Sequence, residues 1–168
     1  MKTSIFSCVM AILSMHHSGF SQSPLPKGKT QINAGVGFSE RGIPIYFGFD
    51  HGIHDNLSLG GEFSYRGYKD TWRGNSYKHN IAGIAMNGNY HFNNVMNIPS
   101  NWDLYAGLNL GFFIWGSDKA YDGPYSSGLG LGAQIGGRYY FSPKTGINLE
   151  FGGGNAFSGG KFGLTFRL

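Results

Sequence analysis

Apolar side chains alternate with glycine or polar residues through most of the chain. In the clearest stretch, residues 104–114, the even positions are all apolar, whereas Tyr105, Gly107, Asn109 and Gly111 hold odd positions. Successive side chains of a β-strand point to opposite faces, so each face of such a strand has its own composition. The pattern recurs in segments of roughly ten residues, which is typical of a transmembrane β-barrel.

The alternation predicts eight strands joined by segments rich in turn-forming residues. The strands are expected at residues 30–39, 42–50, 56–68, 78–92, 102–115, 127–141, 146–153 and 161–168. Gly, Pro, Asn, Asp and Ser in the intervening segments favour turns. Beyond the N-terminus no segment has sustained helical periodicity. We therefore expect an all-β fold, an eight-stranded antiparallel up-and-down transmembrane β-barrel preceded by a signal peptide.

The two faces of the predicted strands differ in charge. Charges inside the strands all lie on the face opposite the apolar one: Glu62, Arg66, Arg138, Glu150 and Arg167. A soluble barrel would turn its apolar face inward and would need a charged outer surface, but here the polar face is mostly glycine, amide and hydroxyl groups. We therefore expect the apolar face to meet lipid. The five charges are predicted to form an ion-pair network in the lumen, because an unpaired buried ion costs several kcal/mol.

Composition and aromatic placement agree with this orientation. Charged residues make up 13% of the chain, against about 25% in an average soluble domain. Aromatic residues gather at the strand ends next to the connections 51–55, 93–101 and 142–145, as in an interfacial girdle. These residues are Phe49, Tyr90, Phe92, Trp102, Tyr139 and Phe141. The net charge of +4 comes without a run of Lys or Arg, so the sequence predicts no nucleic-acid binding.

The N-terminus has the order of features found in an export signal. Lys2 precedes an apolar stretch from Ile5 to Met15, and small residues follow at Gly19 and Ser21. The apolar stretch is too short to span a bilayer as a helix. We predict a signal peptide at 1–21, an extended leader at 22–29 and an outer-membrane β-barrel domain at 30–168. Cleavage would remove Cys8, the only cysteine.

Three segments resemble a known family. Residues 52–61 look like a first periplasmic turn and third strand, residues 136–150 like a last periplasmic turn and the strand after it, and residues 161–168 like a C-terminal strand. Together they resemble the small eight-stranded outer-membrane barrels of the opacity, OmpX and OmpA type in Gram-negative bacteria, a porin-like family. The final Leu168 departs from the aromatic residue that is commoner there. The resemblance implies a cell-envelope protein that the barrel-assembly machinery inserts into the outer membrane.

We therefore predict a non-enzymatic, monomeric integral outer-membrane protein without a cofactor. Its role would be structural, adhesive or surface-protective, and its contacts would include outer-membrane lipids and lipopolysaccharide. A lumen of eight strands is too narrow for a general porin. Two alternatives stay open: an outer-membrane lipid-modifying hydrolase or acyltransferase, and a secreted soluble barrel that binds a small apolar ligand.

The two longest outer loops carry the candidate recognition residues. These are Trp72, Arg73, Tyr77, Tyr121 and Tyr125. Exposed aromatic and Arg side chains suit the recognition of proteins or glycans; the alternative is ordinary loop packing or contact with lipopolysaccharide headgroups.

Other polar clusters have plainer interpretations. We weighed a catalytic set of Asp70, Ser76 and His79, a metal site of Asp50, His51, His54 and Asp55, and a calcium site of Asp118 and Asp122. Proximity in the sequence does not by itself give the geometry of a catalytic set. A polar turn explains the histidine cluster. Two carboxylates do not complete the coordination shell of a calcium ion. We therefore expect no catalytic and no metal site.

Overall fold

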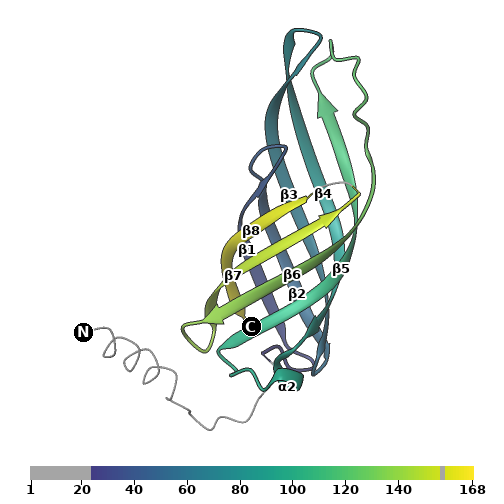
Figure 1. Cartoon of the computed structure of the whole chain (residues 1–168). Coiled ribbons are helices and arrows are strands. Elements are labelled where there is room, and N and C mark those ends of the chain that lie inside the picture. Colours follow the sequence, from purple (N-terminus) through teal and green to yellow (C-terminus); the bar gives the residue numbers. More distant parts are fainter. Residues whose placement is uncertain (1–23, 156–157) are drawn as a thin grey trace, which may run out of the picture.

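Each strand hydrogen-bonds to the strands that precede and follow it in sequence, and the first pairs with the last (Figure 1). The computed structural model describes residues 24–155 and 158–168. Its strands are β1 (Thr30–Ser39), β2 (Ile45–His54), β3 (Leu57–Trp72), β4 (Asn75–His91), β5 (Trp102–Ser117), β6 (Gly128–Tyr140), β7 (Thr145–Gly154) and β8 (Ser158–Arg167). All pairings are antiparallel, so the predicted eight-stranded up-and-down barrel is confirmed. The predicted signal peptide lies outside the described residues.

The outer surface of the barrel is apolar and its lumen is polar. Leu108 and Ile84 point outward, with 66% and 63% of their surfaces exposed. Inward-facing Gln31, Arg138 and Asn148 are buried despite their polarity. The predicted facing of the strands is therefore confirmed. No helix among the described residues is long and apolar enough to cross a membrane.

The β3–β4 hairpin is much longer than the sequence predicted. In place of a loop at 69–77, the strands continue to the pair Trp72–Asn75 and turn through Arg73 and Gly74. Both turn residues have positive φ, 50° and 82°, as two-residue hairpin turns with the strand's own twist require. The outward-facing residues of this extension are polar. The alternation of apolar residues therefore stops at this point, although the strands continue. The hairpin rises with the end of β5 above the rest of the barrel (Figure 1).

At the opposite, lower end of the barrel in Figure 1, the connections and the leader are more ordered than the sequence predicted. The histidines 51 and 54 belong to β2, so the β2–β3 turn shrinks to Asp55 and Asn56. The β4–β5 connection contains a short helix, α2 (Asn93–Met96). The leader folds back on β2: Gly28 N donates to Gly52 O at 2.7 Å, and Gly52 N donates to Lys29 O at 2.9 Å. Leu25, in the same leader, is 1% exposed.

Candidate functional site

Arg138 crosses the lower lumen between two carboxylates. Its guanidinium, which β6 supplies, donates to Asp50 Oδ2 of β2 at 2.8 Å and to Asp103 Oδ2 of β5 at 2.7 Å. All three side chains are almost completely buried. Amides complete the shell of Asp50, because Asn33 Nδ2 donates to it at 2.8 Å and Asn87 Nδ2 at 3.0 Å. This lower network ties β2, β5 and β6 together and fills the lower lumen with buried polar groups.

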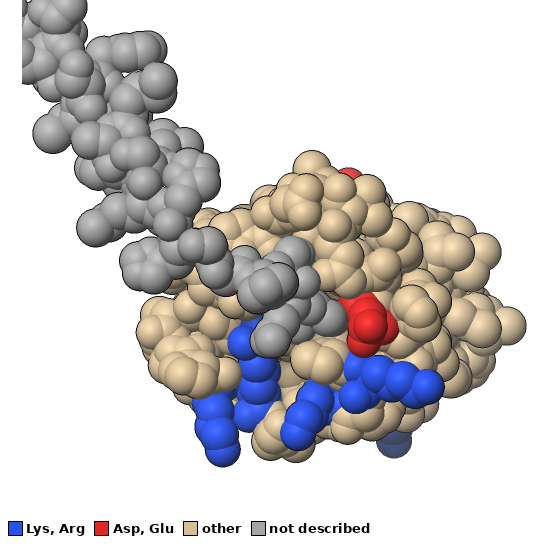
Figure 2. All heavy atoms as spheres, turned by 90° about the horizontal axis from the view of Figure 1, so that it is seen from below, with Lys and Arg blue, Asp and Glu red and all other residues tan. Residues whose placement is uncertain are grey.

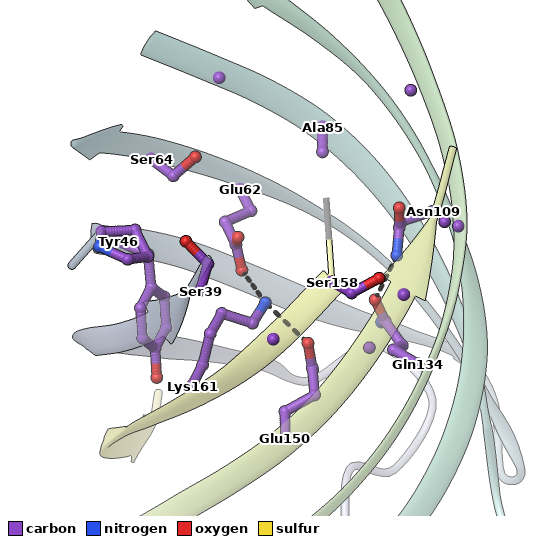
Figure 3. A pocket seen from close by; sticks show the side chains of 18 of the residues that line it. Ser39, Tyr46, Glu62, Ser64, Ala85, Asn109, Gln134, Glu150, Ser158 and Lys161 are labelled. Carbon is purple, nitrogen blue, oxygen red and sulfur yellow. Dashed lines mark hydrogen bonds and ion pairs between the residues drawn. The ribbon is translucent and has the colours of Figure 1, made fainter. Parts of the chain in front are cut away.

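Lys161 makes the corresponding crossing in the upper lumen. Its Nζ, from β8, lies 2.5 Å from Glu62 Oε2 of β3 and 2.7 Å from Glu150 Oε1 of β7 (Figure 3). Tyr105 Oη donates to the other oxygen of Glu150 at 2.8 Å. This upper network lines a cavity of about 140 Å³ together with serine and amide side chains, among them Asn109. A space of that size holds a few water molecules.

The five charges predicted to form the lumen network are distributed over several contacts. Glu62 and Glu150 meet through Lys161, and Arg138 binds acids outside the predicted set. Arg66 Nη1 donates to Ser39 Oγ at 3.0 Å. The Arg167 guanidinium lies 3.3 Å from the centre of the Tyr140 ring, and its Nη2 donates to the carbonyl of Ser100.

Three charged members of these networks were not among the predicted residues: Asp50, Asp103 and Lys161. Each lies at or next to the end of a predicted strand, whereas the predicted network was limited to charges in the interiors of the strands. Their strand parity was the available signal, because all three share the parity of the buried polar residues of their strand.

The predicted recognition residues come together above the lumen, where they pack on one another. Tyr125 stacks on Tyr121, with ring centres 5.9 Å apart, and on Trp115 at 4.9 Å. Tyr77 meets Tyr121 edge to face at 5.3 Å. Partial removal from water raises the pKa of the Tyr121 hydroxyl. Trp72 meets the same ring at 6.3 Å, and we call these five residues the outer aromatic cluster.

Charged groups border the outer aromatic cluster. Arg41 lies over the rings of Trp115 and Tyr125, at 5.3 and 4.9 Å. Arg73, at the hairpin turn, pairs with Asp122 at 3.1 Å, and both side chains are mostly exposed. The cluster thus packs over the buried ring of His79, while Arg73 and Asp122 present charge to the solvent.

The residues considered as a catalytic set lie on both the inner and the outer face of the barrel wall. His79 points inward and lies 2.8 Å from Ser117 Oγ, whereas Ser76 is exposed on the opposite parity of β4. Asp70 accepts a hydrogen bond from Tyr125.

The residues considered as metal ligands are likewise separated from one another. Asp50 is buried in the lumen, whereas His51 is exposed and bonds Thr30. Asp118 accepts from the backbone of Lys78, and Asp122 pairs with Arg73. Within residues 24–155 and 158–168 there is no group of three or more His, Cys, Asp or Glu suited to a metal ion.

Several solved structures with this architecture are outer-membrane barrels. OprG from Pseudomonas aeruginosa matches with a TM-score of 0.70 and 8% identity, over 89% of this chain and 99% of that one. The N-terminal β-barrel domain of Pseudomonas aeruginosa OprF matches with a TM-score of 0.58 and 14% identity, over 84% and 98%. Ail, the attachment invasion locus protein of Yersinia pestis, in complex with the heparin analogue sucrose octasulfate, matches with a TM-score of 0.51 and 12% identity, over 83% and 97%.

These likenesses show the fold. The chain has the architecture of a small eight-stranded outer-membrane β-barrel, as the sequence motifs predicted. No protein-family model matches the chain, and no curated protein matches it in sequence.

Proposed function

We propose that the protein is a monomeric integral barrel of the outer membrane with a structural, adhesive or surface-protective role. In this role it works without catalysis, cofactor or open pore. The observation that carries the proposal is the distribution of side chains: large apolar groups cover the outside, and charged groups pair inside. That distribution suits hydrocarbon around the barrel, because lipid-facing and lumen-facing residues alternate along membrane strands.

The same distribution argues against a soluble barrel that binds an apolar ligand. Such a barrel would have an apolar interior, but the cavity here is bordered by Glu62, Lys161 and Glu150. Its outside would also be an apolar patch far larger than monomeric soluble proteins expose.

Fractionation of the cell tests the membrane location. We expect the protein in the outer-membrane fraction, released by detergent and retained after a wash with alkaline carbonate. Recovery in the aqueous periplasmic or culture fraction without detergent would contradict the proposal.

An adhesive role draws support from the tall β3–β4 hairpin. The hairpin places Arg73 and the polar outward side chains of Lys69 and Lys78 beyond the apolar belt. Cationic groups at this position suit anionic sugars or the phosphates of lipopolysaccharide. Ail, which has the same fold, was solved with a heparin analogue. Arg73 and the two lysines are therefore the residues to test for surface recognition.

Binding to immobilised heparin and to lipopolysaccharide tests this role. We expect the detergent-solubilised protein to bind one of these polyanions and the triple variant Lys69→Gln, Arg73→Gln, Lys78→Gln to lose that binding. The control is Lys144→Gln, which removes an exposed charge at the lower end. Equal binding by the triple variant would contradict recognition through the hairpin and would leave the structural role.

The lower face suits the lipid phosphates of the inner leaflet. Lys and Arg side chains gather on part of this face (Figure 2). Exposed Lys27, Lys29 and Lys144 lie at this end, beside the chain terminus that follows Arg167. Lysine side chains next to an apolar belt extend to the phosphate layer, which supports contact with outer-membrane phospholipid at this rim.

A further inference from the structure

Ser58, His91 and Asp103 form a chain of hydrogen bonds at the lower mouth of the barrel. Ser58 Oγ lies 2.9 Å from His91 Nε2, and His91 Nδ1 lies 2.7 Å from Asp103 Oδ1. The three side chains come from β3, β4 and β5 and point into the lumen. A serine on one ring nitrogen and a carboxylate on the other is the arrangement that activates a serine nucleophile.

The surroundings fix the roles within this Ser–His–Asp set. Arg138 holds the second oxygen of Asp103 at 2.7 Å, which favours the ionised carboxylate. An ionised Asp103 accepts a hydrogen bond from His91 Nδ1–H. In the tautomer that carries its proton on Nδ1, Nε2 faces Ser58 with its lone pair and accepts the hydroxyl proton, which is the arrangement that an attacking serine needs.

The leader covers this end of the lumen. Ser58 is 1% exposed, and its strand partner across the β2–β3 pair is Gly52. Gly52 bonds the leader through both its N–H and its carbonyl. A Cβ at this position would lie 2.4 Å from Pro26 O and 2.7 Å from Leu25 O, so the close contact requires glycine. The leader is therefore a strap fastened beside Ser58.

We propose that Ser58, His91 and Asp103 are a latent nucleophilic site for small carboxylic esters, which the leader keeps closed. Release of the leader opens the inward-facing residues at the lower ends of β3, β4 and β5 to the periplasm. Ser58 Oγ then bonds the ester carbonyl carbon, and its proton moves to His91 Nε2. The bond to the alcohol breaks and the alcohol leaves with that proton. Water then gives a proton to His91 Nε2 and bonds the acyl carbon, the bond from that carbon to Ser58 Oγ breaks, and Oγ takes the proton back from His91 as the carboxylic acid leaves.

This inference goes beyond the proposed function. The closed barrel has a sealed serine and serves in the membrane without catalysis. The nucleophile belongs to the state in which the leader has left Gly52.

Labelling with a fluorophosphonate probe tests the proposal on the full chain. Gly52→Ala should displace the leader, which trypsin cleavage after Lys27 and Lys29 would report. In this variant we expect a phosphonyl adduct on Ser58 by mass spectrometry, and little adduct in the unaltered chain. Added His91→Gln should slow labelling by roughly 10²- to 10⁴-fold, because the general base is lost. Added Ser58→Ala should abolish it.

A matched control is Ser64→Ala, which removes another inward-facing serine from β3. It should leave labelling of the Gly52→Ala protein unchanged. A released leader without an adduct on Ser58 would show that the three residues form an inert structural network and would overturn the proposal. A leader that stays resistant to trypsin in Gly52→Ala would contradict the claim that Gly52 holds the leader in place as a strap. Neither result affects the proposed membrane role, which fractionation tests separately.

Discussion

Individual charges in the lumen act through their ionic partners. Lys161 faces two carboxylates, and Arg138 also faces two, so removal of either cation leaves two acids in a confined space. Removing one partner of a buried ion pair costs much more than the pair itself contributes. The lumen cations are therefore the residues at which a single substitution should affect stability most.

The variant Lys161→Met tests the upper network. It keeps an unbranched side chain, one atom shorter, and removes the charge between Glu62 and Glu150. We expect the free energy of unfolding to fall by about 3 kcal/mol, at the low end of the range for a broken buried pair because the three side chains are partly exposed. Urea unfolding in phospholipid vesicles measures the change. The triple variant with Glu62→Gln and Glu150→Gln should recover most of the loss; no recovery would contradict the ionic account.

The tip of the β3–β4 hairpin and the leader are the elements whose structure could not be predicted from the sequence. The strand count, the order of the strands and the inward and outward faces follow from parity, which is local and strict. The tip of the hairpin, residues 69–72 and 75–77, was missed because its outward side chains, such as Lys69 and Ser76, are polar. Only the tertiary structure shows that these residues pair.

The networks were partly predictable for a related reason. Parity placed Glu62 and Glu150 in the lumen, but the choice of Lys161 as their partner depends on how the strands are staggered around the barrel. The register between β8 and β3, which are not adjacent, leaves no trace in the local pattern. The docking of the leader on Gly52 is equally non-local.

At the hairpin turn, Gly74→Ala should destabilise the tip without unfolding the barrel. Gly74 has a φ of 82°, and a Cβ in this region costs about 1–2 kcal/mol. Hydrogen exchange should speed up at amides near the turn and stay unchanged in β6 and β7. Asn75→Ala, one residue further on, serves as the control. Faster exchange throughout the barrel would contradict the local character of the hairpin.

The whole molecule is a closed cylinder whose lumen is blocked at several levels. The lower network and the upper network occupy the lumen, the outer aromatic cluster lies at its upper end, and the cavity beside the upper network is about 140 Å³. Vesicles that contain the protein should therefore swell in an isotonic monosaccharide solution no faster than vesicles without protein. Swelling at the rate of a general porin would contradict the blocked lumen.

The direction in which the strands face is the claim on which the whole account depends, and two neighbouring residues of β5 test it most directly. Leu108 points outward with 66% of its surface exposed, and Asn109 borders the internal cavity. Unfolding in phospholipid vesicles should show that Leu108→Arg costs about 2–4 kcal/mol. Asn109→Arg should cost clearly less, because its guanidinium can share the water and polar groups of the cavity. Equal costs, or a larger cost for Asn109→Arg, would contradict the assignment of the apolar face to lipid.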